Sequence, residues 1–466
     1  MNHTHVLGFD PSGRSWVTDR SALPAVKTPE LDGVLRIDET ALKAAAQDFG
    51  NLRHHPPIAV LEPDSYEDVV RMVNFAREQG IKIGGRGSGH TSFGQSQVEG
   101  GIVVRMSALN KPPVFGSDRV EVSSGMLWLQ VLAATLEHGL RPPVLTQTDY
   151  LSVGGTLSVG GMDGGSYRYG VQVDNVLELL VVTGEGRLET CSPSRLPELF
   201  NAVLAGLGQC GIILRATLRL IPAHTHTLFV QMLYRDLQTM LADHRLMIAD
   251  GRFDRISAHV MPSSKGGWLH FMNGGCNFTS PALPDKDTLL VGLHHLRGFE
   301  RISTLTYSEY IEQSRQDNDV FTGRSHLPHP WFNMYLPDST VDQFVAGVFA
   351  DLVETETAAD FRTEIYGFNT HLCTRPLFRL PDAPVAFLFN LLGTIPDPIS
   401  AKETVERNRR YFERARELGG KRYPMNAIPM TQEDWRGHFD PYWEQFANAK
   451  RRFDPDKILT PGPGIF

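Results

Sequence analysis

A glycine-rich loop that carries one histidine is the segment of this chain with the clearest chemistry. The stretch GGRGSGHTSFGQSQ, residues 84–97, holds four glycines in the six positions before His90. Successive glycines let backbone amides converge on a diphosphate without obstruction by side chains. A neutral imidazole in such a loop can also bond to the methyl carbon of a flavin ring. We therefore expect a flavin dinucleotide site; the alternative is a glycine-rich hairpin in which His90 only caps a backbone group.

A second glycine-rich stretch, residues 146–165, holds six glycines with polar residues between them. This glycine content is too high for a packed helix or a regular strand. We expect the stretch to form a second backbone surface along the same ligand, and a flexible surface loop is the alternative.

The residues before the first loop predict a βαβ unit. Residues 58–61 are a short apolar run, and Ser65 and Asp68 have the spacing of a capping box. Apolar residues then recur at helical spacing until Gly80, which ends the helix, and residues 81–83 form a strand. The loop histidine thus follows the carboxyl end of a strand, where α/β proteins usually bind their ligands.

Apolar spacing and turn residues predict the remaining elements. We expect helices at 129–136, ended by Gly139, and at 402–418, a hairpin over 177–190, and strands at 212–221, 289–293 and 385–392. Near the C-terminus, aromatic residues recur close to helical spacing and should belong to a core rather than stack on a ligand: Trp435, Phe439, Trp443 and Phe446.

The composition is that of an ordinary globular protein with at least two domains. The chain has 466 residues, of which 21% are charged and 41% hydrophobic, and its net charge is −8. The longest basic run, residues 450–452, is too short to indicate nucleic acid or a membrane surface as partner. The start of the chain does not resemble a leader, so we expect a cytoplasmic protein. Four scattered cysteines are expected to be buried, reduced thiols: Cys191, Cys210, Cys276 and Cys373.

Five motifs follow one another along the chain: RGSGHTSFGQ, GGIVVRMSALN, VGGTLSVGG, VDNVLELLVVTGEG and GLGQCGIILRATLRLIP. In this order they resemble the FAD domain of the vanillyl-alcohol-oxidase superfamily, with the nearest likeness to cytokinin dehydrogenases. PHPWFNMYLP from Pro328 and the final segment from His438 resemble the same branch. The resemblance implies an α+β fold with a two-subdomain FAD-binding domain at 1–221. An α+β substrate-cap domain would follow at 222–430, and residues 431–466 would return to the first domain.

The resemblance also implies where the cofactor binds. FAD would be bound covalently through His90, with further contacts from Gly85, Arg86, Gly87, Ser88, Gly89, Thr91, Gln95, Ser152, Gly154, Gly155, Thr156, Ser158 and Ile213. Berberine-bridge-like relatives add a second bond through a cysteine, which residues 146–165 lack, so one covalent bond is implied. A covalent imidazole raises the flavin potential and favours hydride transfer from an amine or alcohol carbon, with dioxygen or a quinone as acceptor.

The base that removes the substrate proton has two candidates. Cytokinin dehydrogenases place an aspartate six residues before the valine of VGGT, and that count from Val153 reaches Gln147. The local sequence TDYL instead matches the family at Asp149, two residues nearer. Residues two apart share one face of a strand, so we expect Asp149 to act as the base and Gln147 to orient the substrate. Asp149 would otherwise cap a loop.

Two further departures from the family favour a small amine or alcohol other than a cytokinin. The family motif PGQ reads PGP at residues 461–463, and the amine-recognising glutamate of the cap has no counterpart at 255–260. The polar candidates for substrate choice in the cap are His259, Asn333, Tyr335, Asn369 and His371. The competing interpretations are a cytokinin dehydrogenase proper, a flavin-binding protein without catalysis, and a nicotinamide-dependent reductase. The last is disfavoured because the sequence after the glycine-rich loop is not helical.

Overall fold

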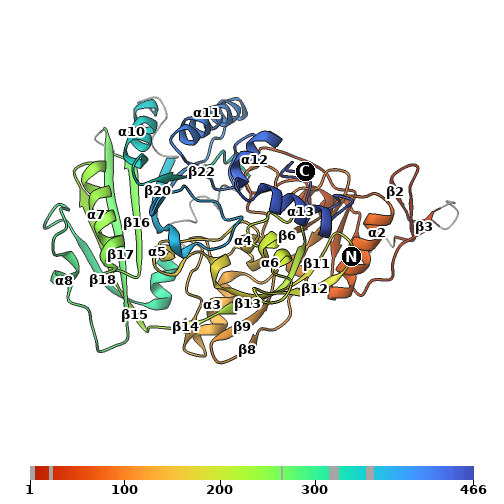
Figure 1. The fold of residues 1–466 in the computed structure, drawn as a ribbon, viewed down its shortest axis with the longest axis horizontal. Coiled ribbons are helices and arrows are strands. Elements are labelled where there is room, and N and C mark those ends of the chain that lie inside the picture. Colours follow the sequence, from red (N-terminus) through yellow and green to blue (C-terminus); the bar gives the residue numbers. More distant parts are fainter. Residues whose placement is uncertain (1–5, 20–24, 264–265, 314–323, 325, 353–360) are drawn as a thin grey trace.

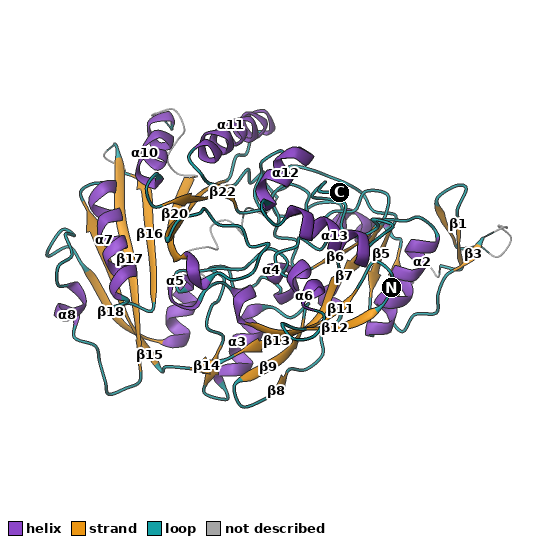
Figure 2. Cartoon of the chain, viewed as in Figure 1, coloured by secondary structure: helices purple, strands orange, loops and turns teal. Residues whose placement is uncertain are grey.

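The chain folds into two lobes, each built around β-sheet (Figure 1). The computed structural model describes residues 6–19, 25–263, 266–313, 324, 326–352 and 361–466. One lobe, on the right of Figure 1, holds a four-stranded and a five-stranded sheet; the other, on the left, holds one eight-stranded sheet. Helices and sheets are mixed throughout, as the cartoon in Figure 2 shows, and the predicted α+β class is confirmed.

The four-stranded sheet leads into the first glycine-rich loop. Its order is β4 (Val34–Arg36), β5 (Ala59–Glu62), β7 (Ile102–Arg105) and β6 (Ile83–Arg86), with β5, β7 and β6 parallel. Helix α2 (Tyr66–Glu78) joins β5 to β6 and begins with the predicted capping box of Ser65 and Asp68. Gly80 follows it in the left-handed conformation, at φ +61°. The βαβ prediction is therefore confirmed. The preceding chain adds α1 (Glu39–Ala45) and a small sheet of β1 (Gly8–Asp10), β2 (Ser15–Val17) and β3 (Val26–Lys27).

Strand β6 lies later in the sequence than predicted, because it takes in the first residues of the glycine-rich loop, Gly84 to Arg86. Glycine fits there because the strand is crowded: a Cβ on Gly84 would lie 2.9 Å from Val98, and one on Gly85 would lie 3.1 Å from Ile212. The loop itself begins at Gly87, and its histidine follows the carboxyl end of the strand.

The five-stranded sheet is antiparallel. Its order is β12 (Leu188–Cys191), β11 (Val176–Val182), β13 (Ile212–Arg219), β9 (Arg119–Ser123) and β8 (Val114–Phe115). The predicted hairpin is β11 and β12, and the predicted strand at 212–221 is β13. Helix α3 (Trp128–Leu136) ends before Gly139 as expected, and α6 (Pro197–Val203) packs beside β12. A short pair, β10 (Leu140–Arg141) and β14 (Ile221–Pro222), closes this part of the chain.

The second glycine-rich stretch differs from the prediction in two ways. It contains a short helix, α4 (Val153–Leu157), where the glycine content had argued against one, and α5 (Ser166–Tyr169) follows. Residues 147–150 form a turn, so the expected strand with Gln147 and Asp149 on one face is wrong. The helix forms because Gly154 packs directly on Ser124, where a Cβ would lie 2.7 Å from the serine Cβ. Close packing outweighs the low helix propensity of glycine here.

The eight-stranded sheet forms the second lobe. Its order is β18 (Arg301–Thr306), β15 (His226–Tyr234), β17 (Trp268–Phe278), β16 (Arg255–Pro262), β20 (Phe361–Asn369), β21 (Val385–Gly393), β19 (Phe332–Pro337) and β22 (Lys421–Arg422). Helices α7 (Leu237–Asp250), α10 (Val341–Asp351) and α11 (Pro398–Glu417) pack with one face of it in an apolar core. Strand β21 and helix α11 were predicted. The strand expected at 289–293 is wrong, because residues Lys286–Leu290 form helix α8.

The C-terminal segment returns to the first lobe. Helices α12 (Gln432–Phe439) and α13 (Trp443–Phe453) carry the predicted aromatic residues, of which Trp435, Phe439 and Phe446 are buried and Trp443 is partly buried. The chain then pairs with β6, where the amide of Thr460 donates to the carbonyl of Ile83. This return places residues 460–463 beside the glycine-rich loop.

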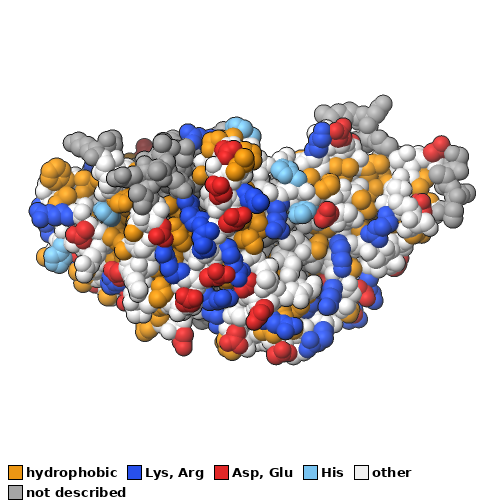
Figure 3. Space-filling view, turned by 90° about the horizontal axis from the view of Figure 1, so that it is seen from above, with side chains coloured by type: hydrophobic (Ala, Val, Ile, Leu, Met, Phe, Trp, Pro, Cys, Tyr) orange, Lys and Arg blue, Asp and Glu red, His pale blue; other side chains and the backbone are white. Residues whose placement is uncertain are grey.

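Charged side chains of both signs are interspersed over the face seen in Figure 3. None of the helices in the described ranges is long and apolar enough to cross a membrane. The four cysteines are free thiols; Cys191 and Cys210 are buried, whereas Cys276 and Cys373 are only half-buried, so the expectation of burial holds for two of them.

Candidate functional site

A cavity lies between the glycine-rich loop, α4, β13 and the C-terminal segment. Every residue expected to contact the cofactor lines it except Arg86. The cavity also takes in residues that sequence reasoning did not single out: Ser96, Met106, Ser124, Leu151, Val159, Leu207, Gly208, Gly211, Ile212, Tyr423, Pro424, Met425 and Thr460. Most of these residues lie in or beside the motifs that resemble the family. Those motifs were the sequence signal that could have identified them as lining residues.

Backbone amides form one wall of the cavity. Across the described residues, the amide nitrogens of residues 87–91 make no hydrogen bond to a protein acceptor. The loop reaches α4 because it has no side chain at Gly87, where a Cβ would lie 1.8 Å from the Ser152 hydroxyl. A row of amide donors without protein acceptors is the arrangement that binds phosphate oxygens.

Serine hydroxyls face the same space. The Oγ atoms of Ser124 and Ser152 are buried in the cavity wall and have no hydrogen-bond partner among the described residues. Buried hydroxyls normally have a partner, and lacking one costs about 1–3 kcal/mol. By contrast, Thr156 accepts from the indole of Trp128 at 2.8 Å, and Ser158 donates to the carbonyl of Gly154 at 2.8 Å. The donor set therefore fits the diphosphate of a dinucleotide such as FAD.

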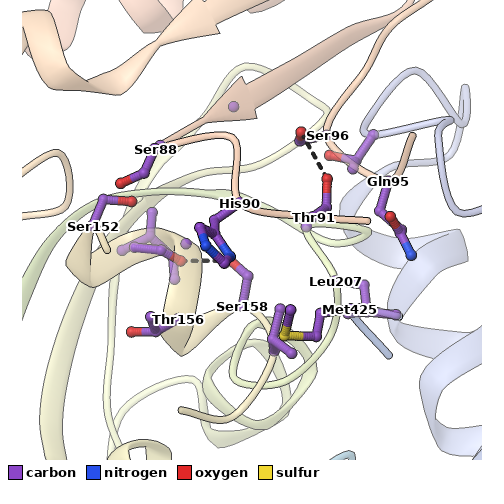
Figure 4. Close-up of a pocket in the computed structure, with 18 of the residues that line it drawn as sticks. Ser88, His90, Thr91, Gln95, Ser96, Ser152, Thr156, Ser158, Leu207 and Met425 are labelled. Carbon is purple, nitrogen blue, oxygen red and sulfur yellow. Dashed lines mark hydrogen bonds between the residues drawn. The ribbon is translucent and has the colours of Figure 1, made fainter. Parts of the chain in front are cut away.

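His90 projects from the loop into this cavity, between Ser152 on one side and Met425 on the other (Figure 4). Its ring stacks on Phe49, with 4.0 Å between the ring centroids. Burial is the main cause that lowers the pKa of His90 from 6.5 to about 4, and His329 lowers it further. The imidazole is therefore neutral at physiological pH, which is the form that acts as a nucleophile.

Asp48 supports the glycine-rich loop, a role that the sequence analysis did not predict for it. One oxygen of its buried carboxylate accepts from the Thr91 hydroxyl at 2.7 Å and from the amide of Gly94 at 2.7 Å. Arg86 lies beside Gly89, where a Cβ would meet its guanidinium, so Arg86 supports the loop rather than lining the cavity. Gln95 ties the loop to the C-terminal part of the chain by donating to the carbonyl of Asn426 at 2.9 Å.

The two catalytic candidates lie apart. Gln147 lines a second, smaller cavity beside the eight-stranded sheet. Its Oε1 accepts a hydrogen bond there from the guanidinium of Arg255 at 3.3 Å. Asp149 is 3% exposed and lines neither cavity. Asp149 nevertheless lies between the two in sequence, because Leu151 belongs to the first cavity and Gln147 to the second.

Two of the polar candidates in the cap share one face of the eight-stranded sheet. Register pairs His259 with Glu364, Glu364 with Asn390, and Asn390 with Asn333. This row lies opposite the helix-covered face, because residues flanking His259 on β16, Ala258 and Val260, belong to the helix-side core.

The other three cap candidates are placed differently. Tyr335 is buried in an aromatic cluster, Asn369 donates to the carbonyl of Tyr167, and His371 is exposed. None of the three lines either cavity.

Comparisons with known proteins agree with this arrangement. Residues 57–192 match the family described as FAD binding domain, and residues 258–466 match the family described as cytokinin dehydrogenase 1, FAD and cytokinin binding. The chain is 35% identical to an uncharacterized oxidoreductase of the fasciation locus of Rhodococcoides fascians, covering 93% of this chain and 99% of the relative. It is 32% identical to cytokinin dehydrogenase 9 of Oryza sativa, covering 94% and 91%, and 31% identical to cytokinin dehydrogenase 4 of Arabidopsis thaliana, covering 92% and 91%. The chain therefore belongs to the cytokinin dehydrogenase family of FAD-dependent oxidoreductases.

Proposed function

We propose that this protein is an oxidoreductase whose FAD is bound covalently through His90 and whose substrate is a small amine or alcohol. The observation that carries the proposal is the neutral imidazole of His90 at the cavity. It lies directly beside the amides of residues 87–91, which have no acceptor among the residues that the structure describes. These amides and the hydroxyls of Ser124 and Ser152 would hold the diphosphate, while Ile213 and Met425 add apolar wall.

The bound flavin would accept a hydride from a C–N or C–O carbon and pass the electrons to dioxygen or a quinone. The contributions of this chain are binding and proton transfer. Asp149 would take the proton from the substrate amine or hydroxyl, and Gln147 would orient the substrate from the second cavity. The chain position of Asp149, between residues that line the two cavities, supports this assignment.

A cytokinin is the second candidate substrate, because several relatives that match over 90% or more of their length are named cytokinin dehydrogenases. The residues around the second cavity favour another small molecule. Of the described residues that line it, none is an aspartate or glutamate that could recognise an amine.

Two measurements test the proposal. Acid-precipitated protein should remain yellow, and His90→Ala should bind FAD through the amides but release it in acid. The holoenzyme should then be mixed anaerobically with a panel of amines, alcohols, hydroxy-sugars and a cytokinin, and bleaching of the flavin identifies the substrate. Free release of the flavin from the wild-type protein in acid would contradict the covalent bond, and a flavin that no compound bleaches would favour a binding protein.

A further inference from the structure

Two arginine side chains line the second cavity. It lies between residues 147–164 of the first lobe and the polar face of the eight-stranded sheet. Arg255 on β16 and Arg362 on β20 line it, and their side chains are only 13% and 14% exposed. Among its described lining residues there is no aspartate or glutamate. A ligand in this space therefore meets two guanidinium groups.

Each arginine is held by a carboxylate that does not line the cavity. Asp163 lies 3.4 Å from Arg255 and also accepts from the amides of Leu145 and Gly165. Glu364 lies 2.7 Å from Arg362 and accepts from the hydroxyl of Tyr366 at 2.9 Å. These carboxylates offset the charge of the guanidinium groups, which reduces the cost of burying them. They also fix the position of the two groups.

The described contacts of Arg255 leave hydrogen-bonding capacity. Its contacts to Asp163 and Gln147 both use Nη2. A guanidinium has five N–H donors in a planar fork, and this fork matches a carboxylate or a phosphate better than a neutral group. The amide of Asn273 and the hydroxyls of Tyr310 and Tyr366 add neutral polar groups to the same wall.

Residues that lie near one another in the chain line the two cavities. Gln147 lines the second and Leu151 lines the first. Four residues of extended chain span at most about 14 Å, which bounds the distance between their Cα atoms. A substrate of this class would have to extend from one cavity to the other, with its reacting carbon in the first and a second group in the other.

We propose that the second cavity binds an anionic group of the substrate, a carboxylate or a phosphate, through Arg255 and Arg362. This inference rests on the proposed function, since it names the class of substrate that the flavin site would oxidise. It also gives the cap the opposite preference to the amine-recognising glutamate that the family resemblance implied.

Calorimetric titration of the FAD-loaded protein tests the charge preference with three probes: benzoate, phenyl phosphate and benzamide. A hydrogen bond to a charged group contributes about 1.5–3 kcal/mol, so the preferred anion should bind at least about tenfold more tightly than benzamide. A higher affinity for benzoate assigns the site to a carboxylate, and a higher affinity for phenyl phosphate assigns it to a phosphate. Equal affinity for all three probes would overturn the proposal.

Substitutions locate the binding. Arg255→Gln and Arg362→Gln should each weaken the preferred anion at least about tenfold and leave benzamide unchanged. Arg219→Gln, an exposed arginine on β13, is the control and should change neither affinity. If Arg255→Gln fails to fold because Asp163 loses its partner, Arg255→Lys keeps a charge there but not the planar fork and should still weaken the anion. Unchanged anion affinity in both arginine variants would contradict the proposal.

Displacement links the anion to the reaction. A substrate that bleaches the flavin should displace the bound anion from the wild-type protein; failure to displace it would show that the cavity is not a substrate site. These outcomes differ from failure of the proposed function, which would appear as loss of flavin in acid or as the absence of any bleaching compound.

Discussion

The ring of Phe49 stacks on the imidazole of His90, with 4.0 Å between centroids and 11° between the ring planes. Phe49 also stacks on His329 at 4.2 Å, so it lies between two imidazoles. Its backbone is fixed to the same loop, because the amide of Phe49 donates to Gly89 and the amide of Gly50 donates to Thr91, both at 2.9 Å. This pairing sets both the position and the plane of the His90 ring.

Phe49→Leu should therefore lower the fraction of FAD that stays on acid-precipitated protein. Leucine preserves apolar volume but not the stacking plane, and an aromatic pair contributes about 0.5–1.5 kcal/mol beyond burial, so the rate of covalent incorporation should fall about threefold to tenfold. The rate is measured by adding FAD to apoprotein and quenching in acid. Phe115→Leu is the matched control. Phe115 packs against His138 in a tilted pair, with 3.9 Å between the ring centroids, and neither residue lines the cavity. An unchanged rate in Phe49→Leu would show that the loop backbone alone orients His90.

Gly87→Ala should abolish FAD binding without unfolding the protein. The new Cβ would lie 1.8 Å from Ser152 Oγ and 2.9 Å from its Cβ, which separates the loop from α4. Flavin content and the melting temperature of the purified protein measure the two effects. Gly437→Ala in α12 is the control, because a Cβ there meets nothing within 4 Å and alanine favours helix by about 0.5–1 kcal/mol. Normal flavin content in Gly87→Ala would mean that the loop does not need this close approach.

His244 should make the protein sensitive to acid. Its ring is buried on α7, neither ring nitrogen has a partner among the described residues, and burial lowers its pKa from 6.5 to about 3. Below pH 6.5 the unfolded chain binds a proton at this site that the folded chain does not, so stability falls as the pH drops toward 3. At pH 5 the loss is about 2 kcal/mol.

His244→Leu should remove this part of the acid sensitivity and change stability little at pH 7.5. Urea unfolding at pH 7.5 and pH 5.0 measures the difference for wild type and variant. His224→Leu replaces an exposed histidine and should keep the pH dependence of the wild type. The same loss on acidification in His244→Leu and wild type would contradict the role of burial.

Local signals predicted the elements that depend on local sequence. The capping box of Ser65 and Asp68, the helix end at Gly80 and the hairpin over residues 177–190 all appear where the sequence places them. Each depends on residues within a few positions of one another, so neighbouring sequence is enough. The glycine-rich loop also lies at a cavity, as its composition predicted.

The errors concern segments whose structure depends on distant partners. Helix α4 forms where Gly154 packs closely against Ser124, a residue far away in the sequence. The turn at 147–150 is held by a contact of the Asp149 carbonyl with the amide of Leu129, and this changed the expected geometry of Gln147 and Asp149. Asp48 and Phe49 support His90 from about 40 residues away, and no periodicity in the sequence marks them. Packing between distant segments has no local signature.

Asp149→Asn should slow flavin reduction at least about tenfold and remove the acidic limb from its pH profile, because asparagine cannot accept the substrate proton. The change keeps the shape of the side chain, so flavin content should equal that of the wild type. Gln147→Ala is the companion variant; its side chain lies in the second cavity, and its loss should weaken substrate binding more than it slows reduction at saturation. Rapid mixing under anaerobic conditions separates the two effects. An unchanged rate in Asp149→Asn would assign this buried carboxylate to the turn and move the base to the polar face of the sheet. There His259 is held neutral, because burial lowers its pKa well below the usual value.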